Sequence, residues 1–270
     1  MPYAYLDGLR LYYEDEGAGR PLVMIHGASQ DTLSWHENIR HFAKRYRVLA
    51  IDLPGHGKSA LVDNRPTTNT EEFVGVVWKF IEAMRLRDTI IIGHSLGAGL
   101  AIMTSILHPD AVFGVVAVCG GAAFRGAAGV SYQGDILRNT QINATDWLET
   151  IFHSVLGRTT TAERRREMAF DATRCSPYVA YGDLLTYSSF NLFESMHRAR
   201  VPVSWIVGED DWSTSPAMAR TTAGQLAAYG VRTEVNELMG IGHIPHWEQP
   251  AAFNSMLEDV LGRLEANAAS

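Results

Sequence analysis

Short runs of apolar, β-branched residues alternate with segments of helical periodicity along most of the chain. A strand-like alternation of apolar and polar side chains opens the series at residues 9–15. Apolar runs of strand length follow it, at residues 21–27, 47–52, 89–93, 112–121, 201–208 and 233–240. Strands that are joined by helices run parallel, and the helices cover both faces of the sheet. The sequence therefore predicts an α/β fold with a doubly wound, mostly parallel sheet.

The alternation of strands and helices breaks between residues 122 and 200. This stretch contains helical patterns around Trp147 and Met196 but no strand that could join the sheet. We therefore expect two parts. Residues 1–121 and 201–270 form the core, and residues 122–200 form a helical lid inserted into it.

The composition favours a globular protein that binds neither nucleic acid nor membranes. The chain has 270 residues and a formal net charge of −7, and its one basic run, residues 164–166, lies in a polar stretch. It does not begin with a basic segment followed by an apolar one, and no segment reaches about 18 consecutive apolar residues. The two cysteines, Cys119 and Cys175, are too few for a disulfide framework. These features predict a cytoplasmic protein with no nucleic-acid or membrane partner.

The strand-like run at residues 89–93 leads into the stretch GHSLG at residues 93–97, after which a helical pattern begins. In a sharp strand-to-helix turn of the form G-x-S-x-G, the serine hydroxyl is lifted clear of the sheet, and close backbone contacts require the flanking glycines. A serine hydroxyl becomes a good nucleophile only when a base and an acid assist it. The pattern therefore predicts a nucleophile, provided that suitable partners occur elsewhere.

Two further motifs supply such partners. The stretch GEDDW at residues 208–212 follows one predicted strand, and GIGHIPHWEQP at residues 240–250 follows the last one. Loops at the carboxyl ends of parallel strands gather at one edge of a sheet. Together with the serine turn, these motifs resemble those of the serine-nucleophile branch of the α/β-hydrolase superfamily. The resemblance covers residues 9–264 apart from the lid, and it implies an eight-stranded sheet with a helical lid insertion.

The chain order serine, aspartate, histidine forms the catalytic triad in this family. The resemblance therefore implies that Ser95 is the nucleophile, Asp211 the acid and His243 the base. Asp211 fits the family's G-x-x-D spacing and its neighbour Asp210 does not, but the motif register is the sole argument between them. His246 lies further along the histidine motif, where we expect a rim or packing residue.

The stretch HGAS at residues 26–29 resembles the family's H-G-x motif. It implies an oxyanion hole formed by the backbone N–H groups of Ala28 and Leu96. No cofactor is implied, and His243 and His246 lack a third nearby ligand for a metal ion. We expect the substrate to contact residues that flank these motifs and one aromatic residue of the lid, namely Gly27, Ser29, His94, Trp212, Ile244 and Trp147.

The resemblance implies a serine hydrolase that cleaves a carboxylic ester or lactone of a small to medium organic substrate through an acyl-enzyme. One alternative is a hydrolase of a carbon–carbon bond in a vinylogous diketone, since family members with the same triad catalyse this reaction. A further alternative is a small-molecule receptor, or a cofactor-free oxygenase or perhydrolase, on the same fold. The sequence identifies neither the substrate nor the oligomeric state, and a homodimer stays open.

Overall fold

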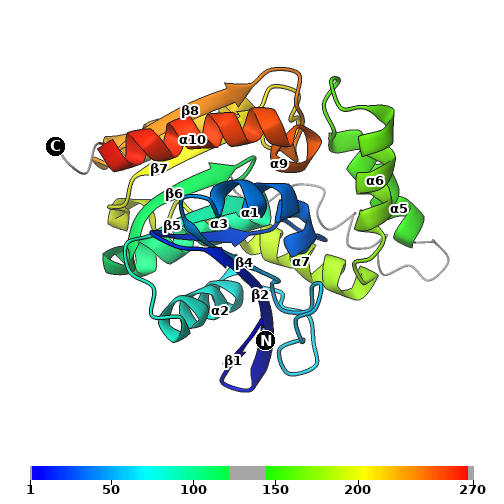
Figure 1. Ribbon diagram of the computed structural model, residues 1–270, viewed down its shortest axis with the longest axis horizontal. Coiled ribbons are helices and arrows are strands. Elements are labelled where there is room, and N and C mark those ends of the chain that lie inside the picture. Colours follow the sequence, from blue (N-terminus) through cyan, green and yellow to red (C-terminus); the bar gives the residue numbers. More distant parts are fainter. Residues whose placement is uncertain (1, 122–143, 267–270) are drawn as a thin grey trace.

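An eight-stranded, mostly parallel sheet forms the centre of the structure, a computed structural model that describes residues 2–121 and 144–266 (Figure 1). The strands are β1 (Tyr3–Leu6), β2 (Leu9–Gly17), β3 (Pro21–Ile25), β4 (Arg47–Ile51), β5 (Thr89–His94), β6 (Val112–Val118), β7 (Val203–Gly208) and β8 (Thr233–Leu238). Their order is β1-β2-β4-β3-β5-β6-β7-β8. β2 pairs antiparallel with β1 and β4, and the other neighbouring pairs are parallel. The predicted fold class is confirmed.

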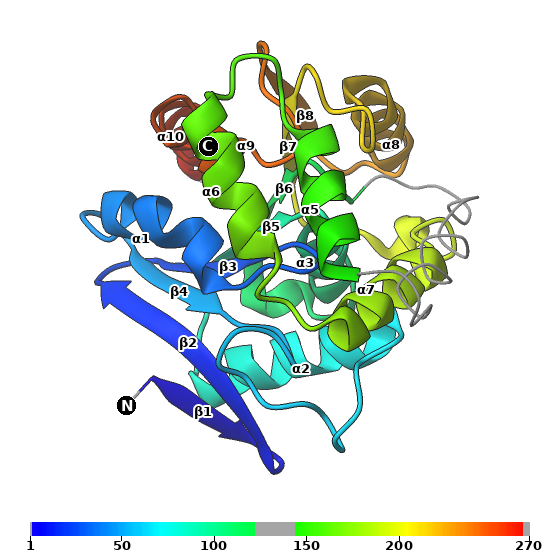
Figure 2. The same ribbon diagram turned by 90° about the vertical axis from the view of Figure 1, so that its right-hand side faces the viewer.

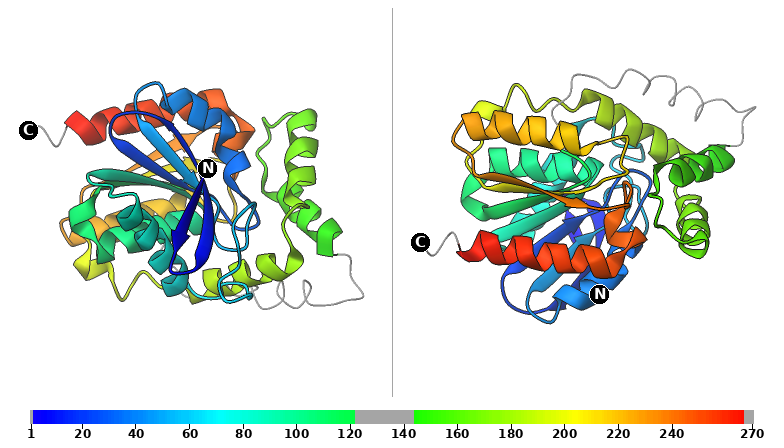
Figure 3. Two further views of the ribbon diagram at one scale, coloured as in Figure 1. Left: turned by 60° about the horizontal axis from the view of Figure 1, so that its bottom comes forward. Right: turned by 90° about the horizontal axis from the view of Figure 1, so that it is seen from above.

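Helices cover both faces of this sheet. The core helices are α1 (His36–Phe42), α2 (Thr70–Ala83), α3 (Leu96–Leu107), α8 (Pro216–Ala228), α9 (Pro245–Glu248) and α10 (Pro250–Ala266). Successive strand residues point to opposite faces, so Leu22 and Met24 of β3 join the apolar core shared with α1 and α10. Val23 and Ile25 join the core shared with α2, α3 and α8. Figure 3 shows α1 and α10 on one face and α3 and α8 on the other. None of the described helices has the length and apolar character that a membrane span requires.

Two strands, β1 and β6, differ in detail from the sequence pattern. β1 has only four residues, and no separate strand is predicted for it. β6 ends at Val118, although the apolar run extends to residue 121. Cys119 and Gly121 have positive φ values of 44° and 68°, which turn the chain out of the strand. This turn brings the end of β6 beside the start of α3.

Within the described residues, three α-helices lie between β6 and β7 in the chain. They are α5 (Ala144–Val155), α6 (Ala162–Ala172) and α7 (Pro177–Ser189), and we call them the inserted helices. Figure 2 looks onto these helices, and the ends of the parallel strands lie behind them. The described residues from 144 to 200 contain no strand. The first part of the predicted lid, residues 122–143, lies outside the described residues.

Candidate active site

Ser95 lies at the tight turn between β5 and α3. Its φ and ψ are 51° and −113°, a backbone conformation that residues other than glycine rarely adopt. A Cβ on Gly93 would lie 2.1 Å from the carbonyl oxygen of Gly97, and a Cβ on Gly97 would lie 2.5 Å from that of Ile25. A Cβ on Gly120, just after β6, would lie 2.3 Å from the carbonyl oxygen of Ser95. The glycines are therefore a steric requirement of the turn that presents the serine.

Replacing Gly93 by alanine is expected to lower the free energy of unfolding by more than about 3 kcal/mol, because the new Cβ would clash with backbone atoms that cannot move aside. Urea denaturation measures this change. Gly75→Ala is the matched control. Gly75 lies within α2 and an added Cβ would meet no atom within 4 Å, so alanine is expected to stabilise the protein by about 0.5–1 kcal/mol. Similar effects of the two substitutions would contradict the steric explanation.

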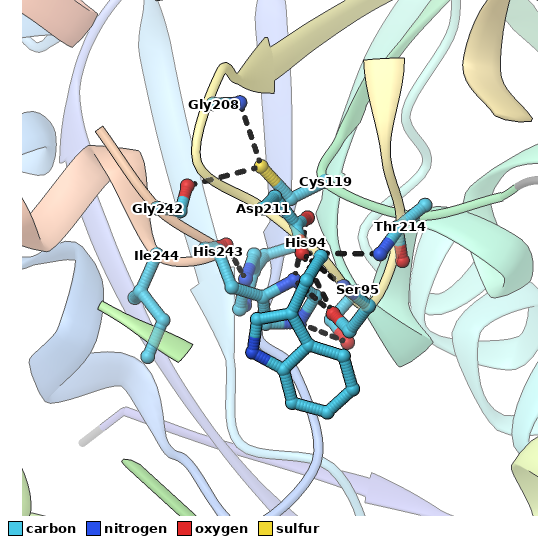
Figure 4. Close-up of polar contacts among 12 residues, drawn as sticks. His94, Ser95, Cys119, Gly208, Asp211, Thr214, Gly242, His243 and Ile244 are labelled. Atoms are coloured by element: carbon cyan, nitrogen blue, oxygen red, sulfur yellow. Dashed lines mark hydrogen bonds and ion pairs between the residues drawn. The ribbon is translucent and has the colours of Figure 1, made fainter. Parts of the chain in front are cut away.

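Ser95, His243 and Asp211 form a continuous hydrogen-bonded chain, which we call the Ser-His-Asp chain (Figure 4). His243 Nε2 lies 3.0 Å from Ser95 Oγ, and His243 Nδ1 lies 2.8 Å from Asp211 Oδ2. Asp211 follows β7 and His243 follows β8, so both come from loops at the carboxyl ends of neighbouring strands. Because the carboxylate accepts a hydrogen bond, Nδ1 carries the proton and Nε2 can accept one from the serine.

Asp211 is held by further donors and stays ionised. Its Oδ1 accepts hydrogen bonds from the backbone N–H groups of Ser213 and Thr214, at 2.9 and 3.0 Å, and from the Ser213 hydroxyl at 2.8 Å. Burial raises the pKa of a carboxyl group, but His243 and these hydrogen bonds hold the pKa of Asp211 well below its ordinary value. Burial lowers and the Asp211 carboxylate raises the pKa of His243, with a net rise. The carboxylate thus makes His243 a stronger base.

Asp210 faces the loop between α5 and α6 instead of His243. Its Oδ2 accepts the backbone N–H of Arg158 at 2.7 Å, and its Oδ1 pairs with the Arg158 guanidinium. Glu209 binds the same guanidinium. Of the two aspartates, the structure therefore places Asp211 beside His243, as the motif register predicts.

The two predicted oxyanion donors belong to segments on either side of Ser95. Leu96 is the first residue of α3, where a backbone N–H has no partner within the helix. Ala28 lies in the loop after β3, between Gly27 and Ser29, whose N–H groups both donate to side chains. Within the described residues, the N–H groups of Ala28 and Leu96 have no hydrogen-bond partner. With respect to the residues that the structure describes, both donors can bind a ligand.

Two predicted substrate contacts, His94 and Ile244, are buried and engaged by the protein. His94 Nε2 lies 2.8 Å from the carbonyl oxygen of His243, and its Nδ1 lies 2.9 Å from Gln30 Oε1. Burial and the neighbouring His246 and His243 hold the pKa of His94 well below its ordinary value. Ile244 packs in an apolar cluster with residues of α5 and α6. Both side chains thus support the loops around the site from within, and their contact with substrate stays a prediction.

Of the other four predicted contacts, Trp212 and Trp147 lie against or on the inserted helices, and Gly27 and Ser29 lie in the loop after β3. Trp212 is 61% exposed, and its indole N–H donates to a carbonyl oxygen of α5 at 2.9 Å. Trp147 is half-buried among the inserted helices. Gly27 approaches His94 so closely that a Cβ would lie 2.5 Å from its Nδ1, and Ser29 is buried. A contact of these four residues with substrate stays a prediction.

Cys119 lies next to the Ser-His-Asp chain, and ligand atoms of Cys119, Asp211 and His243 lie within 4.8 Å of one another. The distance of 2.8 Å between Nδ1 and Oδ2 is that of a hydrogen bond. Two ligands of one tetrahedral zinc ion would lie about 3.4 Å apart. The Cys119 sulfur accepts the N–H of Gly208 at 3.4 Å, and burial holds the pKa of its thiol well above the ordinary value. The Cys119 thiol is therefore protonated, and Asp211 and His243 are hydrogen-bonded to each other. This arrangement suits proton transfer by His243 better than metal binding.

Glu248, to which the sequence assigns no role, connects the histidine loop to the loop between α5 and α6. This buried carboxylate accepts the N–H of Ile244 at 2.9 Å, of Gly242 at 3.1 Å and of Gly157 at 2.8 Å. It also accepts the hydroxyl of Thr160. The one signal for this role in the sequence is the place of Glu248 within the histidine motif. A glutamate that is buried beside apolar residues needs hydrogen-bond donors around its carboxylate.

Comparison with known proteins defines the family. A family model described as "Alpha/beta hydrolase family" matches residues 22–256. (E)-2-((N-methylformamido)methylene)succinate hydrolase of Acinetobacter baylyi is 33% identical over 101 residues, which are 37% of this chain and 38% of that protein. 2-hydroxy-6-oxononadienedioate/2-hydroxy-6-oxononatrienedioate hydrolase of Paraburkholderia phymatum is 25% identical over 275 residues, which cover 94% of this chain and 92% of that protein. The enol-lactonase of Burkholderia xenovorans LB400 has a similar structure, with a TM-score of 0.85, 20% identity, and coverage of 97% of this chain and 100% of that chain.

The sheet order, the serine turn and these matches define the family of the chain. The chain belongs to the alpha/beta hydrolase family, as its motifs predict. Both relatives named above are hydrolases.

Proposed function

We propose that the protein is a serine hydrolase that cleaves a carboxylic ester or lactone of a small to medium organic molecule through an acyl-enzyme. The observation that supports this most strongly is the Ser-His-Asp chain, with Ser95 Oγ 3.0 Å from His243 Nε2 and Nδ1 2.8 Å from Asp211. A base that is oriented by a carboxylate is what activates a serine hydroxyl. This chemistry needs no cofactor.

The reaction would proceed in two halves. Ser95 Oγ attacks the carbonyl carbon while His243 Nε2 takes the hydroxyl proton, and the N–H groups of Ala28 and Leu96 receive the oxyanion. Asp211 stabilises the imidazolium, which then donates its proton to the leaving oxygen as the C–O bond breaks. Water attacks the acyl-enzyme with His243 again as base, and the acid product and free serine result.

The value of kcat/KM is expected to fall at low pH along a limb whose midpoint lies above 6.5, the ordinary pKa of histidine. His243 accepts the serine proton only while Nε2 is unprotonated. Since Asp211 produces a net rise in the pKa of His243, more of the enzyme is protonated and inactive near neutral pH. Activity is therefore lost as the pH falls through the raised pKa and reaches a plateau above it. Initial rates at low substrate concentration across the pH range measure this limb, and a midpoint below 6.5 would contradict the assignment.

A second candidate is hydrolysis of a carbon–carbon bond in a vinylogous diketone. What favours it is the similarity to the Paraburkholderia phymatum hydrolase, which extends over nearly all of both chains. The same serine and base would act, but the leaving group would be a carbon atom that must be protonated.

A substrate panel separates these activities. It contains chromogenic short-chain and medium-chain esters, lactones, and a 2-hydroxy-6-oxo-dienoate, each assayed with wild type and Ser95→Ala. Ester or lactone turnover with kcat/KM above about 10⁴ M⁻¹ s⁻¹, lost in Ser95→Ala, is the expected result. Inertness toward esters and lactones together with turnover of the diketone would overturn the proposal in favour of carbon–carbon hydrolysis. Oxygen consumption with aromatic substrates, or tight binding without turnover, would favour the oxygenase or the receptor.

A further inference from the structure

A buried carboxylate of the inserted helices contacts the loop that carries Ala28. Asp183 lies on α7, and only 1% of its surface is exposed. Its Oδ2 accepts the backbone N–H of Ser29 at 2.8 Å and lies 2.9 Å from His56 Nε2. Ser29 follows Ala28 directly and has a left-handed φ of 60°. The contact therefore fixes the peptide next to the proposed oxyanion donor.

The surroundings of His56 favour its protonated form. Its Nδ1 lies 3.1 Å from the carbonyl oxygen of Pro54, and its Nε2 faces the Asp183 carboxylate. Both partners are acceptors, so the ring can donate to both of them only when both nitrogens carry protons. Burial lowers and Asp183 raises the pKa of His56, with a net rise. Asp183 and His56 thus form an ion pair that is shielded from water.

Burial of this ion pair removes two charged groups from water, which costs folding free energy that an apolar pair in the same place would not cost. Charges that leave water are compensated only when all their polar atoms find partners, and apolar residues often replace such a pair without loss. Asp183 Oδ1 is buried and has no hydrogen-bond partner within the described residues. Buried polar atoms are normally hydrogen-bonded, and exceptions such as this oxygen are expected at functional positions.

The rest of the same loop is held as firmly. Gly27 N donates to Gln30 Oε1 at 3.0 Å. His26 Nδ1 donates to the Gly27 carbonyl oxygen at 2.8 Å, and its Nε2 accepts the N–H of Leu53 at 2.9 Å. Burial lowers the pKa of His26 to about 4, so the ring stays neutral and keeps this pattern. Within the described residues, the N–H of Ala28 is left free between two fixed peptide groups.

We propose that Asp183 is a positioning residue for the oxyanion hole. By holding the N–H of Ser29, this residue of α7 sets the direction of the Ala28 N–H, so that catalysis depends on how α7 is docked on the core. The inference rests on the proposed function, because an oxyanion must form at Ser95. Loss of one such donor costs about 10²–10³-fold in kcat, and a misplacement of about 1 Å costs up to 10²-fold.

Steady-state kinetics of Asp183 variants test this inference. Asp183→Ala is expected to lower kcat by about 10- to 100-fold with little change in KM, because an oxyanion donor acts in the transition state and not on bound substrate. Asp183→Asn keeps an oxygen that can accept the Ser29 N–H but loses the charge, and about a three- to tenfold loss is expected. The affinity for an aryl trifluoromethyl ketone, which forms a tetrahedral adduct with a serine, should fall in the same proportion as kcat/KM.

Asp171→Asn is the matched control. Asp171 lies on α6, and its carboxylate pairs with Arg174, three residues further along the chain. Its kcat and inhibitor affinity are expected to equal those of wild type. Circular dichroism and thermal unfolding identify the folded variants, and Asp183→Asn carries the test if Asp183→Ala does not fold.

Three results would overturn the inference. They are wild-type kcat and inhibitor affinity in a folded Asp183 variant, a loss that appears in KM alone, and an equal loss in Asp171→Asn. A wild type that neither hydrolyses esters nor reacts with a serine-directed inhibitor would overturn the proposed function as well. An active wild type with unaffected Asp183 variants would overturn the inference alone.

Discussion

Ser95→Ala is expected to lower kcat by at least about 10³-fold while KM changes little. The substitution removes the attacking oxygen, whereas the backbone donors and the binding surface remain and supply the residual rate. Alanine has the same Cβ as serine, so the strained turn at φ 51° is expected to form as before. The loss is measured with the best substrate of the panel, and single-turnover experiments should show no acyl-enzyme.

Ser105→Ala is the control for this substitution. Ser105 is a buried serine of α3 whose hydroxyl donates to the carbonyl oxygen of Ile102, away from the Ser-His-Asp chain. Its kcat is expected to match that of wild type. Retention of more than about one tenth of the activity in Ser95→Ala would show that the chemistry does not pass through this serine.

Asp211→Asn is expected to lower kcat by about 10⁴-fold near neutral pH. An asparagine amide that donates to His243 Nδ1 moves the imidazole proton to Nε2, where the ring can no longer accept the proton of Ser95. The substitution also removes the charge that raises the pKa of His243, so the acid limb of the remaining activity should move to lower pH. The full pH profile of the variant measures both effects.

Asp210→Asn makes the same chemical change one residue away. It breaks a contact with Arg158 at the surface and leaves the Ser-His-Asp chain intact. Its kcat is expected to stay within about threefold of wild type, because surface ion pairs contribute little. A loss in Asp210→Asn as large as that in Asp211→Asn would contradict the assignment of the acid.

The Ser-His-Asp chain is the part of the site that the sequence predicts best, because each member lies in a short motif with a local physical cause. The serine turn requires glycine at positions 93 and 97 for steric reasons that the structure makes explicit. Asp211 and His243 follow parallel strands, so strand order brings them to one edge of the sheet.

The residues that hold these loops could not be predicted, because their partners are distant in the sequence. Asp183 is 154 residues from Ser29, and Glu248 is 91 residues from Gly157. Neither spacing has a local signature. Only the docking of the inserted helices on the core brings these groups together.

Proximity to a motif is weaker evidence than membership of the motif. His94, the last residue of β5, is buried and lies within hydrogen-bond distance of the His243 carbonyl oxygen and of Gln30. Ile244 follows His243 and packs on the inserted helices. Contact of these two side chains with substrate therefore stays a prediction.

The most direct test of the claim that Ser95 is an activated nucleophile is the mass of the intact protein after treatment with a fluorophosphonate. Activation by His243 predicts a single adduct on the wild type that is absent from Ser95→Ala and from His243→Ala. A folded wild type without an adduct, or an adduct that persists in Ser95→Ala, would contradict the claim.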